Sequence, residues 1–115
     1  MQARQLTWSD AVAQKLAIAM GDDQALFERE VQAGISHVWE LLGGDLLMIC
    51  RAEGDELVVC CLQGKNVTEG GPLIIENARR CGFKSVRFHT KHDKLGELGK
   101  TLGFKKVETI YGLEL

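Results

Sequence analysis

Two histidines near the C-terminus, His89 and His92, are the side chains best suited to move a proton at neutral pH. An imidazole changes its charge close to that pH, which is why histidine often serves as a general acid or base. The run from His89 to Asp93 also has the composition of a metal-binding cluster, but its spacing defines no third ligand. A plain surface or capping role is the third alternative. We predict no metal site and keep proton transfer as the hypothesis for His92.

Carboxylates and thiols within apolar segments form a second set of candidates. Glu40 and Glu56 lie in or beside segments typical of central strands. A carboxylate there can act as a general base or can simply face solvent. Cys60 and Cys61 are adjacent, so we expect their side chains to lie on opposite faces of a sheet. All four cysteines lie in or beside apolar runs without a CxxC pair, which favours free thiols that pack in a core.

A glycine-bearing segment over residues 61–83 raises the question of an anion site. The letters GGP at 70–72 place a proline where it suits the first turn of a helix, and Gly82 is suited to end that helix. This pattern predicts a helix over 72–81 preceded by a loop over 63–71. A helix start offers unpaired N–H groups and the positive end of the helix dipole, which together bind phosphates. The alternative is that these glycines only turn the chain.

The composition is that of an ordinary globular protein. The chain has 115 residues, of which 45% are hydrophobic and 26% charged, so we expect a single domain over 1–115. Residues 1–78 carry 5 basic and 12 acidic side chains (−7), and residues 79–115 carry 9 and 4 (+5), for a total of −2. The acidic balance and the scarcity of aromatic residues argue against nucleic acid as a partner. The absence of a membrane-spanning stretch and of a signal-peptide core predicts a cytoplasmic protein without a membrane partner.

Hydrophobic periodicity gives an order of elements. It predicts the order β-α-α-β-β-β-α-β-α-β, which is an α/β fold with a mixed, mostly antiparallel sheet and helices on both faces. The segments are a short strand near residue 5, helices over 8–20 and from 22 towards Gly34, strands within 35–42, 45–52 and 56–63, a helix over 72–81, a strand over 85–90, a helix over 93–102 and a last strand within 105–115.

This order, together with the segment LGKTLGF at 98–104 and LTWSD at 6–10, resembles the GNAT superfamily of N-acetyltransferases. The resemblance implies that acetyl-CoA is the co-substrate, that it lies where the fourth and fifth strands separate, and that its pyrophosphate binds the loop before the next helix. On this basis the residues expected to bind the cofactor are Leu62, Gln63, Gly64, Lys65, Thr68, Gly70 and Gly71. The family pattern is Arg or Gln, two residues, Gly, one residue, then Gly or Ala. Counting from Gln63 places Asn66 and Thr68 at the small positions, and counting from Lys65 places Thr68 and Gly70 there.

The resemblance also implies a reaction, the transfer of an acetyl group to a primary amine of a small molecule or a protein. Glu40 would act as the base. Many members carry a tyrosine that protonates the leaving thiolate, but Gly99 stands at that position, so His92 is the expected substitute. The formation of a homodimer is a further possibility that the sequence leaves undecided. The alternative is a non-catalytic module that keeps the fold to bind CoA or a protein partner.

Overall fold

The computed structural model describes residues 3–88. The elements in this part follow the predicted order as far as the fifth strand. They are β1 (Ala3–Leu6), α1 (Asp10–Met20), the 3-10 turn η1 (Gly21–Asp23), α2 (Gln24–Gln32), β2 (His37–Leu41), the 3-10 turn η2 (Leu42–Gly44), β3 (Leu46–Glu53), β4 (Glu56–Gly64), α3 (Val67–Arg80) and β5 (Ser85–Phe88). The helix predicted over 93–102 and the last predicted strand lie outside the described residues.

The strands form one sheet with the order β1-β2-β3-β4-β5. Neighbours from β1 to β4 are antiparallel, whereas β5 pairs with β4 in parallel. The parallel pair follows from the chain path, since α3 carries the chain back along the sheet before β5 begins. The predicted α/β class with a mixed, mostly antiparallel sheet is therefore confirmed.

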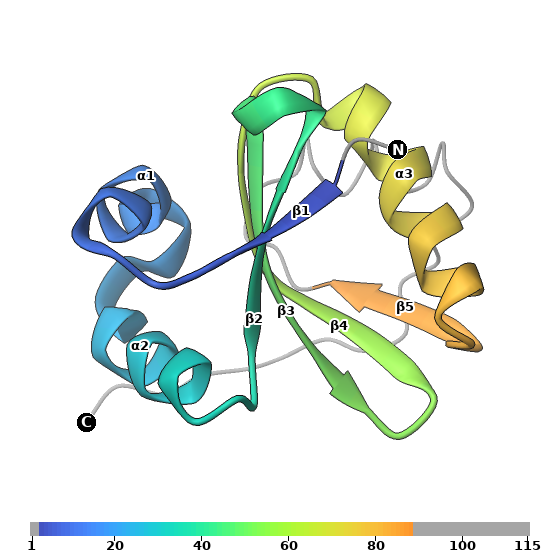
Figure 1. The fold of residues 1–115 in the computed structure, drawn as a ribbon, viewed down its shortest axis with the longest axis horizontal. Helices are drawn as coiled ribbons and strands as arrows, with labels where there is room; N and C mark the ends of the chain where they lie inside the picture. The colour runs from blue at the N-terminus through green and yellow to red at the C-terminus, as the bar shows by residue number, and fades with distance from the viewer. Residues whose placement is uncertain (1–2, 89–115) are drawn as a thin grey trace, which may run out of the picture.

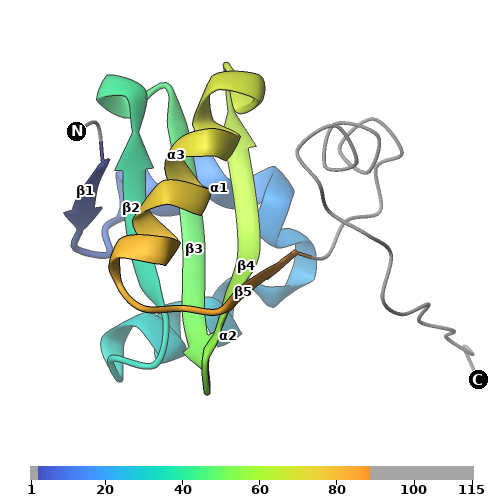
Figure 2. The ribbon, with the colours of Figure 1, turned by 90° about the vertical axis from the view of Figure 1, so that its right-hand side faces the viewer.

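Helices cover both faces of this sheet, as predicted. In Figure 1 α1 and α2 lie on one side of the strands and α3 lies on the other, and Figure 2 shows α3 crossing in front of the sheet. Each face has its own apolar core. Under α1 and α2 the buried residues are Val12, Ala13, Leu16, Met20, Val38, Leu47, Ile49 and Cys61. Under α3 they are Leu41, Leu46, Met48, Cys50, Val59 and Ile74.

The first helix begins at Asp10, two residues later than the predicted start at residue 8. Ser9 is the capping residue, because its hydroxyl oxygen accepts a hydrogen bond from the N–H of Val12 at 3.2 Å. Asp10 is then the first helical residue. Its negative charge there suits the positive end of the helix dipole.

The predicted start of the third helix is also wrong. α3 begins at Val67, and Pro72 lies inside the helix. Proline has no N–H to donate to the carbonyl four residues back, so Pro72 leaves the carbonyl of Thr68 without its usual helical partner. The helical turn that precedes Pro72 is therefore held by fewer hydrogen bonds than the rest of α3. The end of the helix agrees with the prediction, since Gly82 follows it with φ of 87°.

No helix in the described part of the chain is long and apolar enough to span a membrane.

Candidate functional site

Within residues 3–88, the strands β4 and β5 are paired along only part of β4. Their described register runs from Glu56 opposite Ser85 to Val59 opposite Phe88. The rest of β4, up to Gly64, keeps its pairing with β3, and no residue of β5 within 3–88 lies opposite it. The second half of β4 is thus an open strand edge among the described residues, and it leads directly into α3.

A β-bulge lies at the point where this open half begins. The register between β3 and β4 shifts between Ile49 and Cys50, so that Ile49 is opposite Cys61 while Cys50 is opposite Val59. Cys60 is the extra residue. An extra residue breaks the alternation of side chains along a strand, and Cys60 and Cys61 both contact the core under α1 and α2. The prediction that these two cysteines lie on opposite faces is wrong for this reason.

Burial keeps the thiols near the bulge protonated. Removal from water raises the pKa of Cys61 to about 12. It also raises the pKa of Cys60, although the nearby Arg51 guanidinium partly offsets this effect. Because the thiolate is the reactive form of cysteine, neither side chain is prepared to act as a nucleophile at neutral pH. All four cysteines are free thiols, as predicted.

At its end β4 passes very close to the turn before β3. Gly64 has φ of 136°, and a Cβ atom on it would lie 2.1 Å from the carbonyl oxygen of Asp45. The same carbonyl accepts a hydrogen bond from the N–H of Lys65 at 2.8 Å. Gly64 is required by this close backbone approach, since only glycine combines that φ with the missing side chain. This contact explains why residue 64 is a glycine, without its predicted role in binding a cofactor.

The start of α3 presents three backbone N–H groups in a row. Asn66 adopts a left-handed conformation, with φ of 64° and ψ of 41°, and its carbonyl accepts hydrogen bonds from the N–H groups of Glu69 and Gly70. The N–H groups of Asn66, Val67 and Thr68 have no acceptor among the described residues. They are the free donors expected at a helix start.

This geometry favours one of the two frames of the glycine pattern. In the frame that starts at Gln63, Asn66 takes the first small position, and its left-handed conformation is one that glycine adopts readily. Thr68 takes the second position and carries one of the three free N–H groups. In the frame that starts at Lys65, Gly70 would take this second position, but its N–H is already bonded to Asn66 at 2.9 Å.

The two glycines before the proline belong to the helix and not to a loop. Gly70 and Gly71 are both buried. A Cβ atom on Gly70 would lie 2.3 Å from Cδ2 of Leu46, so this glycine lets α3 pack closely on β3. The predicted loop over 63–71 is therefore wrong beyond Asn66, and the structure supplies a packing reason for Gly70 that needs no ligand.

Two further predicted cofactor residues point to the two faces of the sheet. Leu62 packs against the core under α3. The side-chain oxygen of Gln63 accepts a hydrogen bond from the N–H of Ala19 at 2.8 Å, which links the end of β4 to the last turns of α1. Among the predicted residues, the structure thus brings Lys65 and Thr68 beside the free donors and places the others in structural contacts.

The predicted base, Glu40, lies away from this region. It forms an ion pair at 2.7 Å with Arg4 of the edge strand β1. In the register Glu40 is opposite Leu47, and Leu47 is opposite Gln63, which puts Glu40 two strands, or about 10 Å, from β4. Its role as a base remains a prediction. The predicted acid His92, with His89 and Gly99, lies outside the described residues.

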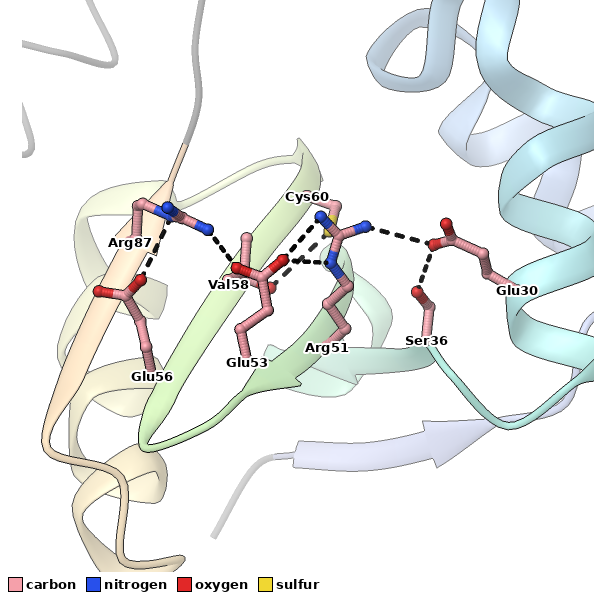
Figure 3. Close-up of polar contacts among 8 residues, drawn as sticks. All are labelled: Glu30, Ser36, Arg51, Glu53, Glu56, Val58, Cys60 and Arg87. Atoms are coloured by element: carbon pink, nitrogen blue, oxygen red, sulfur yellow. Dashed lines mark hydrogen bonds and ion pairs between the residues drawn. The ribbon is translucent and has the colours of Figure 1, made fainter. Parts of the chain in front are cut away.

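A group of charged residues, of which the sequence singled out only Glu56, lies at the other end of β4. Glu56 interacts with Arg87 and Ser85 of β5, and Arg87 also interacts with Glu53 of β3. Arg51 continues the contacts towards α2 (Figure 3). The alternation of Arg51 and Glu53 along β3 is the signal that could have pointed to it.

A hollow of about 380 Å³ lies at the opposite edge of the sheet from β4. It is formed by the first two strands and the end of α2, and its lining residues are Gln5, Leu6, Thr7, Trp8, Val31, Gln32, Ser36, His37 and Val38. None of the predicted site residues is among them, so this hollow is separate from the region at the end of β4.

Comparison with known proteins identifies a shared fold. No protein-family model matches the chain, and no curated protein matches it either. Several solved structures do. The acetyltransferase candidate YycN from Bacillus subtilis matches with a TM-score of 0.63 at 12% identity, over 98% of both chains.

Two other structures match over nearly their whole length. A protein described as "a probable acetyltransferase" matches with a TM-score of 0.71 at 11% identity, over 100% of this chain and 97% of its own. TTHA1254 from Thermus thermophilus matches with a TM-score of 0.56 at 17% identity, with the same coverage. At such low identities the likeness is one of architecture, and the chain shares the fold of these three proteins, two of which are described as acetyltransferase candidates.

Proposed function

We propose that the protein is an acetyl-CoA-dependent N-acetyltransferase that acts on a primary amine. One observation carries the proposal: within residues 3–88, β5 is paired with β4 only as far as Val59, just before a bulge, and the rest of β4 leads into a helix start whose three N–H groups have no acceptor in this part of the chain. The fold shared with acetyltransferase candidates and the resemblance of the sequence to the GNAT superfamily support the same conclusion.

The residues at the start of α3 fit a pyrophosphate. The free N–H groups of Asn66, Val67 and Thr68 would donate to its oxygens, and the positive end of the α3 dipole would attract its charge. Lys65 is exposed directly before them and would add a positive charge. Asp45 and Glu69 lie nearby as well. These two carboxylates would weaken anion binding, so we expect a modest affinity.

The open half of β4 fits the reactive part of the same molecule. When bound, acetyl-CoA supplies an acetyl group activated as a thioester. Backbone N–H groups of β4 beyond the bulge would hold and polarise the acyl carbonyl, because fixed donors stabilise the charge that develops on such an oxygen. The two cores keep this strand rigid from both faces, which favours a constant orientation of the reacting groups.

Proton transfer is assigned to residues that the sequence suggested. Glu40 would need to leave its pair with Arg4 to take a proton from the amine, directly or through water. His92 would protonate the leaving thiolate in place of the tyrosine that Gly99 replaces. These residues do not identify the acceptor, whose amine can belong to a small molecule or to a protein.

A second candidate function is a non-catalytic module that binds CoA or a protein partner. Two observations favour it over a standard enzyme. Gly64 and Gly70 have packing reasons of their own, and Gly99 stands where a proton donor is common. This alternative predicts CoA binding without turnover, or no CoA binding at all.

The first test removes one of the free donors. Thr68→Pro deletes the N–H of Thr68 at a position in the first helical turn, where proline is tolerated. A hydrogen bond to a charged group contributes about 1.5–3 kcal/mol, so CoA should bind about 10-fold more weakly or worse. Thr68→Ala is the matched control, because it keeps the N–H and should bind CoA nearly as the parent does.

Calorimetry with CoA measures both variants, and their melting temperatures show whether the helix is intact. Equal affinity of Thr68→Pro and the parent would contradict the pyrophosphate site. Acetyl transfer to a panel of amines, followed by mass spectrometry of the products, then separates the two functions. CoA binding with no product from any amine would favour the non-catalytic module.

A further inference from the structure

Five charged side chains form a continuous chain of ion pairs on the sheet face that carries α1 and α2. We call it the ladder; its members are Glu30 of α2, Arg51 and Glu53 of β3, Glu56 of β4 and Arg87 of β5. Figure 3 shows them in a row from α2 across the strands to β5. Glu30 lies 3.5 Å from Arg51, Arg51 lies 3.1 Å from Glu53, Glu53 contacts Arg87, and Arg87 lies 3.3 Å from Glu56.

The ladder crosses β4 through contacts between side chains, and these contacts are separate from the backbone pairing of that strand. Arg51 is opposite Val58 and Val58 is opposite Arg87, so the two arginines flank an apolar residue in one row. Glu53 contacts both guanidinium groups. It therefore ties β3 to β5 directly over β4, immediately before the register between β4 and β5 reaches its last described pair at Val59.

The ends of the ladder are anchored as well. Ser36, which is fully buried, donates a hydrogen bond to Glu30 at 2.7 Å. Ser85 donates one to Glu56 at 2.9 Å. Nε of Arg87 is buried and has no partner in hydrogen-bond geometry among the described residues, and the closest charge is the Glu56 carboxylate. Each carboxylate of the ladder thus has both a cation and a second polar contact.

The side chains of the ladder are between 17% and 42% exposed, so they are less accessible than ordinary surface ion pairs. The Arg80–Glu76 pair on α3 is a useful contrast, with 64% and 57% exposed. Single exposed pairs contribute little to stability. Half-buried groups that share partners restrict geometry more strongly, because moving one guanidinium leaves two carboxylates without it.

We propose that Arg87 is a positioning residue for the acetyl transfer proposed above. Through Glu53 and Glu56 it holds β5 against the hairpin of β3 and β4, and so it fixes the position of β5 beside the strand that leads to the free donors. Through Arg51 and Glu30 the same contacts fix α2 on this face. The proposal rests on the proposed function for the reaction, but the part that concerns β5 stands on the ladder alone.

The test replaces the charge and keeps the stem of the side chain. Arg87→Met should speed hydrogen exchange of the amides over 86–88 about 10-fold and weaken CoA binding about 5-fold. Arg87→Lys, which keeps a positive charge, should recover part of both losses. Arg80→Met is the matched control: it removes an exposed ion pair from α3 and should change neither quantity.

A merely structural role would give a different result. If Arg87→Met accelerates exchange evenly across the sheet, in step with a lower melting temperature, the positioning role is overturned. A double-mutant cycle with Glu53→Gln supplies a second criterion. The effects of the two changes on the hydrogen-exchange rates of the amides over 86–88 should be less than additive. Strict additivity would contradict the contact across β4.

Failure of the proposed function can be distinguished from failure of the role of Arg87 in holding β5. If the parent protein does not bind CoA, the link between Arg87 and the reaction is overturned together with the proposed function. The exchange measurements then still decide whether Arg87 holds β5, since they need no ligand.

Discussion

The two ends of β4 are built in opposite ways. At its first end, beside the turn at Gly54, polar side chains crowd together and β5 pairs with the strand. At its last end, at Gly64, the backbone itself makes the close contacts, and β5 is not opposite it within the described residues. The bulge at Cys60 separates the two halves.

The difference shows how a strand can be held firmly and still present free backbone groups. Side-chain ion pairs secure the first half. In the second half, missing side chains allow β4 and α3 to approach β3 so closely that Gly64 and Gly70 contact it. The free N–H groups at 66–68 lie just beyond this tightly packed corner, where any ligand would meet a fixed backbone and not a mobile loop.

The largest expected effect comes from the glycine at the open end. Gly64→Ala would place a Cβ atom 2.1 Å from a backbone carbonyl oxygen, and we expect it to lower the free energy of unfolding by about 4 kcal/mol. Gly54→Ala is the matched change at the closed end. Gly54 also has a positive φ but open space around it, so we expect a loss of about 1 kcal/mol.

Urea unfolding of both variants measures this contrast. If the two substitutions lower the free energy of unfolding equally, the close backbone contact at Gly64 does not constrain the fold. The difference between the two ends of β4 would then be contradicted.

A smaller effect is expected inside α3. Gly70→Ala brings a Cβ atom to 2.3 Å from Cδ2 of Leu46, and overpacking of this kind costs about 1–3 kcal/mol. Alanine is a better helix former than glycine by about 1 kcal/mol, so the net loss should be about 1 kcal/mol. Leu46→Val removes the obstructing carbon.

The double variant sharpens the point. Thermal unfolding of Gly70→Ala with Leu46→Val should show less destabilisation than the sum of the two single changes, because the contact is lost only once. Additive effects would mean that Gly70 is not there for packing, and its predicted role in cofactor binding would regain support.

The smallest effect concerns the reactivity of the thiols. Their raised pKa does not change the stability of the protein at neutral pH. Burial raises the pKa of Cys50 and Cys61 to about 12 from 9.0, whereas Cys81 is exposed. With iodoacetamide at about pH 8, just below the ordinary thiol pKa, mass spectrometry should find Cys81 labelled first and these two only after unfolding. Because the folded pKa is the higher one, their contribution to stability is complete below pH 9 and is lost as the pH rises from 9 towards 12. Early labelling of Cys61 would indicate that β4 opens beyond the bulge.

Some parts of this structure could be predicted from local patterns and others could not. The three strands of the meander, with turns at 42–44 and Gly54, follow from apolar runs and turn residues that act over a few positions. The start of α3 was predicted at the proline and lies five residues earlier. A proline inside a helix is costly, and here the packing of Gly70 on Leu46 of β3 accompanies that extra turn, a contact between distant parts of the chain.

The candidate site shows the same division. Thr68 and Lys65 were predicted and lie beside the free donors, but the donors themselves are backbone groups of Asn66, Val67 and Thr68. Backbone donors leave no trace in residue type. The ladder was missed because Glu30, Arg51 and Arg87 are far apart in the chain and only the sheet register brings them together.

The sequence by itself determined the class of the fold and, as far as β5, the order of the elements, because helix and strand periods and turns depend on neighbouring residues. The tertiary structure alone decided where β4 carries its extra residue, which glycines pack against a strand and which charges meet across the sheet. These features depend on register and on the separation of packed elements, and a shift of one residue in register would change all three.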